Sequence, residues 1–172
     1  MSAKRLFIES GNPQQLEKEF WARDLPGFVR IANIEPNCLE LELTESQMIA
    51  NTTSGPNLRE LHSIGIRIAV DDFGTGYSAL RYLKTFPIST LKIDKSFVTG
   101  LPEDPDNAAI VRAVISLGDV MGLNVIAEGV ETRQQLRFLR AHGCKKLRGF
   151  SSENRSRQNS FARTSVVPRF SI

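Results

Sequence analysis

One pattern recurs along the chain: a short apolar or alternating run, followed by a segment with helical periodicity. The runs are residues 38–43, 66–70, 90–93 and 125–127, and they are rich in Val, Ile and Leu. Four strand–helix units at spacings of about 24 to 34 residues predict a parallel sheet with helical crossovers. Either a (β/α)₈ barrel or an open doubly wound sheet satisfies this α/β pattern.

The predicted helices have defined ends. A glycine after the last periodic residue is typical of a helix C-terminus, and a Thr followed three residues later by Gln is typical of an N-terminal capping box. Thr132 and Gln135 have that spacing. Helices are therefore expected at residues 57–64, 78–84, 107–121 and 132–142.

Composition excludes several classes of protein. The 172 residues are 41% hydrophobic and 24% charged, as in ordinary globular domains. Only two cysteines and two histidines occur, without zinc-site spacing, so a bound metal would have oxygen ligands. No run of about 18 apolar residues and no signal-peptide pattern is present. We therefore expect a cytoplasmic protein without a membrane segment.

Charge is distributed unevenly. Residues 145–172 hold seven basic residues and one acidic residue, a local net of +6, so the remaining residues carry a net of −3. Such a basic segment can bind nucleic acid. This one lacks aromatic interleaving and helical periodicity, so double-stranded nucleic acid is not an expected partner.

Acidic residues follow every predicted strand. Because the carboxyl ends of parallel strands meet at one edge of the sheet, these side chains are expected to gather there. Carboxylates suit Mg²⁺ or Mn²⁺, and two such ions can clamp a phosphate. Each residue alone also fits a solvated turn or a helix cap. The strand-end residues are Glu42, Glu45, Asp71, Asp72, Lys92, Asp94, Glu128 and Glu131.

Adjacent Asp71 and Asp72 would point to opposite faces of a regular strand. A turn or bulge would let both reach one site. Lys92 could hold a water molecule or stabilise phosphate charge there. These residues together favour a dinuclear metal site.

Four segments resemble the EAL-domain cyclic di-GMP phosphodiesterases in their order and spacing. They are residues 42–46 (ELTES), 71–78 (DDFGTGYS), 91–94 (LKID) and 127–132 (AEGVET). The resemblance implies a (β/α)₈ TIM-type barrel that hydrolyses cyclic di-GMP to linear pGpG with Mg²⁺ or Mn²⁺. It covers roughly residues 1–144, beginning inside the family pattern at Met1.

The resemblance also assigns roles to residues. Glu42 would ligate metal, Asp71 and Asp72 would bind the metal pair, and Asp94 would support the metal shell. Lys92 would lie by the catalytic water. Glu128 would be the general base or a carboxylate of the metal site. Glu45 would brace the loop that contains Gly74, Thr75 and Gly76. Supporting roles fall to Thr44, Ser46 and Glu131.

The sequence departs from the family pattern at both ends. The strand carrying the family's first glutamate and the following asparagine ligand are expected to be missing, so the barrel would be incomplete and the isolated chain weakly active. Where the family has Gln before Gly-[Tyr/Phe], this chain has Arg148, which would place a fixed positive charge near the substrate. We expect a partial EAL domain at residues 1–150. Residues 151–172 are expected to be a disordered basic tail outside the family register.

Three functions remain open at this point. The chain could be a phosphodiesterase, an inactive module that binds a cyclic dinucleotide or a protein, or a non-functional gene fragment. Enolase-type sites also combine carboxylate-bound Mg²⁺ with a lysine. The resemblance implies cyclic di-GMP as ligand, a homodimer through residues 73–78, and an accompanying GGDEF or sensory domain.

Overall fold

A computed structural model describes residues 6–9, 20–50, 55–76, 80–149 and 169–170. Within them lies one sheet of seven parallel strands in the order β6-β5-β4-β3-β2-β1-β7. The strands are β1 (Leu6–Glu9), β2 (Leu39–Thr44), β3 (Arg67–Phe73), β4 (Thr90–Ile93), β5 (Asn124–Ala127), β6 (Lys146–Leu147) and β7 (Arg169–Phe170).

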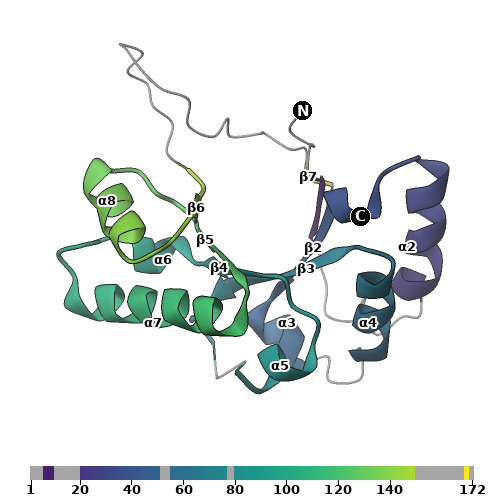
Figure 1. Cartoon of the computed structure of the whole chain (residues 1–172), viewed down its shortest axis with the longest axis horizontal. Coiled ribbons are helices and arrows are strands. Elements are labelled where there is room, and N and C mark those ends of the chain that lie inside the picture. The colour runs from purple at the N-terminus through teal and green to yellow at the C-terminus, as the bar shows by residue number, and fades with distance from the viewer. Residues whose placement is uncertain (1–5, 10–19, 51–54, 77–79, 150–168, 171–172) are drawn as a thin grey trace, which may run out of the picture.

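Helices line one side of this curved sheet, from α2 at one end to α7 and α8 at the other (Figure 1). They follow the strands in sequence, as expected for right-handed crossovers. The helices are α2 (Phe20–Ile31), α3 (Glu45–Ala50), α4 (Gly55–Ser63), α5 (Leu80–Thr85), α6 (Lys95–Val98), α7 (Pro105–Met121) and α8 (Arg133–Ala141), with a 3₁₀ turn at Pro36–Cys38.

The prediction of an α/β fold that is an incomplete barrel is confirmed. The four predicted strands correspond to β2, β3, β4 and β5. Strands β6 and β7 lie at opposite ends of the described sheet and do not pair with each other, so the sheet is open. Residues 151–172 were expected to be disordered, but the two residues of β7 within that segment pair with β1. Residues 150–168 lie outside the described part.

Local sequence signals account for the helix ends. Asp104 accepts hydrogen bonds from two backbone amides at the start of α7, and Gly122 ends that helix in the left-handed region at φ 69°. Thr132 and Gln135 form the predicted capping box of α8. These three features confirm the sequence-based helix boundaries to within a few residues.

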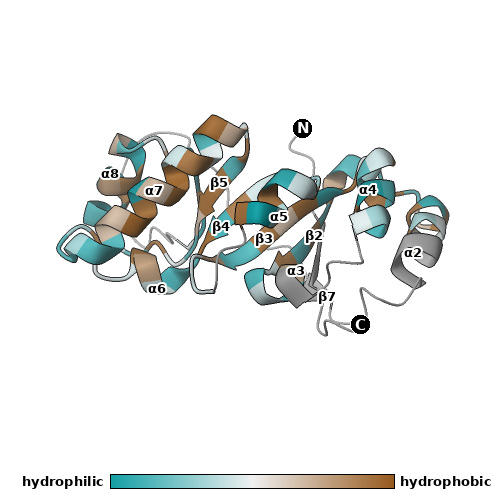
Figure 2. Cartoon of the chain, turned by 90° about the horizontal axis from the view of Figure 1, so that it is seen from below, coloured by the Kyte–Doolittle hydropathy of each residue, from teal (hydrophilic) through white to brown (hydrophobic). Residues whose placement is uncertain are grey.

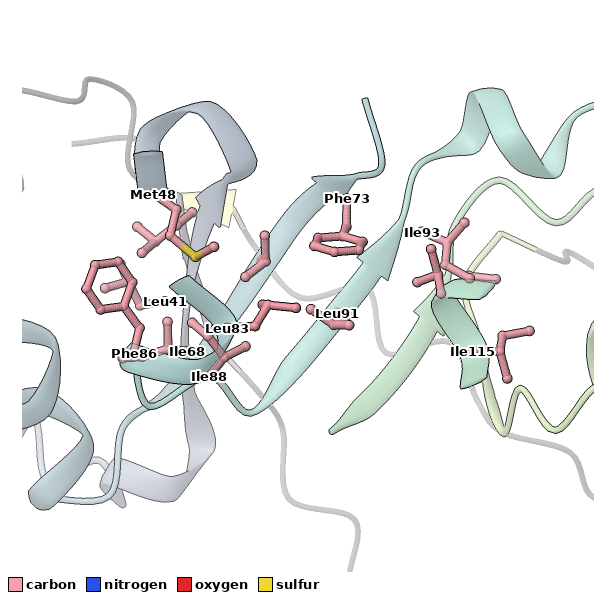
Figure 3. Packing of buried hydrophobic residues seen from close by; sticks show 14 of the residues in the cluster. Leu41, Met48, Ile68, Phe73, Leu83, Phe86, Ile88, Leu91, Ile93 and Ile115 are labelled. Carbon is pink, nitrogen blue, oxygen red and sulfur yellow. The ribbon is translucent and has the colours of Figure 1, made fainter. Parts of the chain in front are cut away.

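The hydrophobic core lies between the sheet and its helices. Leu41, Met48, Ile68 and Phe86 lie close together in it (Figure 3). Hydrophobic residues also gather on β3, β5 and α7 (Figure 2). At the contact of α7 with β5, a Cβ on Gly118 would lie 2.2 Å from Val125 Cγ2, so this helix packs closely only with glycine.

The other face of the sheet is polar and yet buried. The alternation of leucine and glutamate in residues 38–43 would normally indicate a strand with one solvated face. Instead Glu40 is fully buried and accepts a hydrogen bond from Thr90 Oγ1 at 3.2 Å, with Arg67 Nε at 3.9 Å. A polar inner face of this kind places charged side chains inside the curve of the sheet.

No helix within the described ranges is long and apolar enough to cross a membrane.

Candidate site of one lysine and three carboxylates

Lys92 lies at the point where three carboxylates from neighbouring strands meet. Its Nζ is 3.0 Å from Glu42 Oε1, 2.8 Å from Asp71 Oδ2 and 3.1 Å from Glu128 Oε1. The lysine is only 1% exposed, and Glu42 only 3%. We call these four residues the lysine cluster, and they are all strand-end residues singled out by the sequence.

Parallel register brings the cluster together. Glu42 is on β2 beside Ala69 of β3, and Lys92 on β4 lies one position beyond the Val70–Leu91 pair. The amide of Glu128 donates to Ile93 O at 3.2 Å, which holds the end of β5 against β4. The cluster therefore lies at the carboxyl edge of the sheet, where α/β folds place their ligand sites.

The Asp71-Asp72 pair lies on a bulge. Pairing with β4 shifts between Val70 and Phe73, so one more residue lies on β3 than on β4 over this stretch. Asp72 has φ 52°, in the left-handed region that an aspartate adopts more readily than most residues. The expected bulge is thus present, and it lets both side chains reach the same edge.

Electrostatics in the cluster follow from burial and proximity. Burial raises the pKa of Glu42, and Lys92 lowers it without cancelling the effect. Burial lowers the pKa of Lys92, but the hydrogen bond to Asp71 and the charges of the three carboxylates outweigh it and hold that pKa above its usual value. Lys92 therefore stays cationic at neutral pH.

Asp72 and Asp94 form a second acidic pair nearby. Burial and then the charges of Asp71 and Asp94 raise the pKa of Asp72. Burial also raises the pKa of Asp94, but hydrogen bonds from the Ser96 hydroxyl and amide lower it. Together with the other hydrogen bonds they outweigh burial, so the pKa lies below its usual value. Asp94 is the N-cap of α6, so the helix-cap role considered for it from the sequence is present. Its role in a metal site stays a prediction.

Glu45 braces the loop after β3. Its Oε2 accepts hydrogen bonds from the amides of Gly74 at 3.1 Å and Gly76 at 3.2 Å. The loop is also closed by Thr75, whose amide and hydroxyl donate to Asp72 O. Gly74 has φ 102°, which favours glycine. This geometry agrees with the role that the sequence suggested for Glu45.

We expect Glu45→Ala to release this loop. The two loop amides lose a buried acceptor, which should lower the free energy of unfolding by about 1–3 kcal/mol. Amide hydrogen exchange at Gly74 and Gly76 should accelerate at least tenfold, while Glu60→Ala, at an exposed site on α4, should change neither quantity. Unchanged exchange at the two glycines in Glu45→Ala would contradict the bracing role.

The other predicted supporting residues lie outside the lysine cluster. Thr44 caps α3, exchanging hydrogen bonds with Gln47. Ser46 is exposed and, within the described residues, makes no hydrogen bond to the cluster. Glu131 pairs with Lys95 of α6 at 2.6 Å, both side chains being more than half exposed. The predicted dimer contact stays a prediction, since residues 77 and 78 lie outside the described part.

Arg148 was expected to place a positive charge near the substrate, but the sequence named no partner for it in the site. Arg148 follows β6, and its Nη1 lies 3.1 Å from Glu128 Oε1, the same oxygen that Lys92 contacts. The resemblance pointed to this residue, whereas strand periodicity did not, because a strand of two residues gives no periodic signal.

The site fits a hard divalent cation in its donor chemistry. Both oxygens of Glu42 are buried; Oε1 lies 3.0 Å from Lys92 Nζ, and Oε2 has no hydrogen-bond partner within the described residues. Among the described residues, the five carboxylates of Glu42, Asp71, Asp72, Asp94 and Glu128 lie near two cationic side chains, those of Lys92 and Arg148, so negative charge is in excess there. In the described ranges no three His, Cys, Asp or Glu side chains converge at metal-site spacing. In this structure the Lys92 ammonium is the cation that the three carboxylates of the cluster contact.

Comparison with known proteins gives one consistent family. The family model described as "EAL domain" matches residues 2–153. The bifunctional diguanylate cyclase/cyclic di-GMP phosphodiesterase MucR of Pseudomonas aeruginosa is 47% identical over 119 residues, which are 69% of this chain and 17% of MucR. The chain thus spans less than a fifth of that relative.

Solved structures agree. The MucR phosphodiesterase in complex with c-di-GMP superposes with a TM-score of 0.78 at 39% identity, covering 83% of this chain and 58% of that one. The calcium/cy-diGMP complex of BlrP1 from Klebsiella pneumoniae superposes with a TM-score of 0.77 at 30% identity, covering 85% of this chain and 37% of that one.

Proposed function

Because the chain belongs to the EAL domain family, we propose that its site hydrolyses cyclic di-GMP to linear pGpG with Mg²⁺ or Mn²⁺. The observation that supports this is the lysine cluster: three carboxylates from three strands gathered within 3.1 Å of one buried ammonium. A gathering of acidic groups around a cation at the carboxyl edge of a parallel sheet suits the binding and cleavage of a phosphodiester.

Each residue has a task in this proposal. Glu42, Asp71 and Asp72 are the side chains that would hold the divalent metal, which when bound supplies Lewis-acid polarisation and a water of lowered pKa. Lys92 Nζ donates to the attacking water and offsets charge that develops on the phosphate oxygens. Glu128 accepts the proton of that water. Glu45 keeps in place the loop that directly follows the strand carrying Asp72.

The direct test is turnover by the purified chain. With Mn²⁺ and cyclic di-GMP, we expect linear pGpG to accumulate, and Asp71→Asn to reduce its formation at least 100-fold, because the variant loses the negative charge both for the metal and for the 2.8 Å ion pair with Lys92. Product is measured by liquid chromatography.

Calorimetry with cyclic di-GMP in Ca²⁺ separates binding from cleavage. Binding without product would replace the phosphodiesterase with a nucleotide-binding module. Neither binding nor product, from protein that unfolds cooperatively, would overturn the proposed function.

A further inference from the structure

The ring of Phe97, on the short helix α6, lies against the loop that follows β3. A Cβ on Gly74 would be 3.0 Å from Phe97 Cε2, so the ring occupies the space where a side chain at this position would begin. From this geometry we propose that Phe97 is a positioning residue, whose ring holds the loop so that Asp72 stays beside Asp94 for the binding of a divalent cation. The inference rests on the proposed function, in which Asp72 holds the metal.

Two segments of the chain meet at two neighbouring points here. One segment carries Asp72 and, two residues later, Gly74, and the other carries Asp94 and, three residues later, Phe97. The side chains of Asp72 and Asp94 lie within hydrogen-bonding distance of each other, and the Phe97 ring covers Gly74. An apolar contact therefore joins the same two segments as the acidic pair does.

Helix α6 provides a fixed support for the ring. Val98 is fully buried and anchors the helix in the core. The Phe97 amide donates to Asp94 O at 3.2 Å, and the Ser96 amide donates to Asp94 Oδ1 at 2.9 Å. Because one hydrogen-bonded turn carries both the ring and the Asp94 carboxylate, a contact made by the ring also fixes the position of the loop relative to that carboxylate.

The loop passes this contact on to Asp72. The Thr75 amide and hydroxyl donate to Asp72 O at 3.3 Å and 2.8 Å. Asp72 has φ 52°, a left-handed conformation that a residue other than glycine keeps only when its surroundings hold it. Glu45 holds one side of the loop through its hydrogen bond from the Gly74 amide. Phe97 holds the side that faces α6.

Repulsion between the carboxylates explains why an apolar contact matters at this place. Burial and then the charges of Asp71 and Asp94 raise the pKa of Asp72, so the ionised side chains repel one another. A hydrogen bond between two carboxyl groups is lost when both are ionised, whereas the packing of a ring on a glycine does not depend on charge. The Phe97 contact therefore keeps the two segments together when both carboxylates carry the charge that a hard cation prefers.

The test is the Mn²⁺ affinity of Phe97→Ala, with Phe138→Ala as the matched control. Phe138 is likewise a half-buried phenylalanine, and its ring stacks on that of His142 near the end of α8. Mutating a residue that orients a metal ligand typically lowers metal affinity or activity 10–100-fold. We expect the dissociation constant for Mn²⁺, measured by calorimetry on the whole chain, to rise at least tenfold in Phe97→Ala and by less in Phe97→Leu. Phe138→Ala should stay within twofold of the wild type, although both alanine variants lose a ring and with it some stability.

Amide hydrogen exchange gives a readout that needs no metal. We expect the Thr75 amide, which donates to Asp72 O, to exchange at least tenfold faster in Phe97→Ala than in Phe138→Ala. Unchanged exchange at Thr75, or an equal loss of Mn²⁺ affinity in the two alanine variants, would overturn the positioning role.

The outcome for the wild type separates this inference from the proposed function. A chain that binds Mn²⁺ without cleaving cyclic di-GMP would refute the phosphodiesterase, and the Mn²⁺ affinities of the variants would still decide the role of Phe97. A chain that binds no Mn²⁺ would overturn both. Should Phe97→Ala not fold, Phe97→Leu is compared with Phe138→Leu by the same two measurements.

Discussion

Lys92→Met should abolish turnover and strongly destabilise the chain. Methionine has nearly the shape of lysine but leaves the buried carboxylate of Glu42 and the partly buried carboxylate of Asp71 without their cation. Removing one partner of a buried ion pair costs about 3–5 kcal/mol, because the remaining charge keeps its desolvation penalty. We expect a loss of that size in urea unfolding without added metal, and at least a 100-fold fall in kcat/KM for cyclic di-GMP.

The matched control for this prediction is Lys95→Met. Lys95 pairs with Glu131 at 2.6 Å, but the two side chains are 58% and 62% exposed. Exposed pairs contribute about 0–1 kcal/mol, so the unfolding midpoint should barely change. Equal midpoints for Lys92→Met and Lys95→Met would show that the carboxylates around Lys92 do not depend on its charge.

The contrast between these lysines illustrates what the sequence could predict. Both follow or lie within β4, and residue type alone does not distinguish them. Lys92 lies in β4 and Lys95 is the first residue of α6, but only the register of β3 and β5 against β4 shows that three carboxylates meet at Lys92. The positions of these residues after predicted strands were enough to place them at the carboxyl edge of the sheet. Which of them contact one another depends on how the strands pair, and the sequence does not give that pairing.

The interior of the sheet was harder to predict for a physical reason. Alternating leucine and glutamate indicates one wet face in most sheets. In a curved sheet whose polar face turns inward, Glu40 is buried as completely as Leu41. The strand was therefore predicted from its alternation, while the burial of Glu40 is learned from the structure alone. Strands β6 and β7 were missed because two residues carry no period.

Asp72→Asn should separate stability from function. Asparagine tolerates the left-handed φ of 52° as well as aspartate does, so the bulge should be retained. The pKa of Asp72 is raised by burial and then by the charges of Asp71 and Asp94, so ionising this side chain costs more in the folded chain than in the unfolded chain. Removing that charge should leave the unfolding free energy unchanged or raise it by on the order of 0.5 kcal/mol.

Metal affinity and turnover of Asp72→Asn should fall, although its stability should not. The amide keeps one oxygen but loses the negative charge that a hard divalent cation prefers. We expect Mn²⁺ affinity, measured by calorimetry, to fall at least tenfold and kcat/KM to fall at least 100-fold, while Asp119→Asn at an exposed site on α7 changes neither. A variant that is less stable but binds Mn²⁺ normally would assign Asp72 a purely structural role in the bulge. A more stable, inactive variant would mean that the charge crowding at Asp72 is maintained for metal binding, at the expense of the fold.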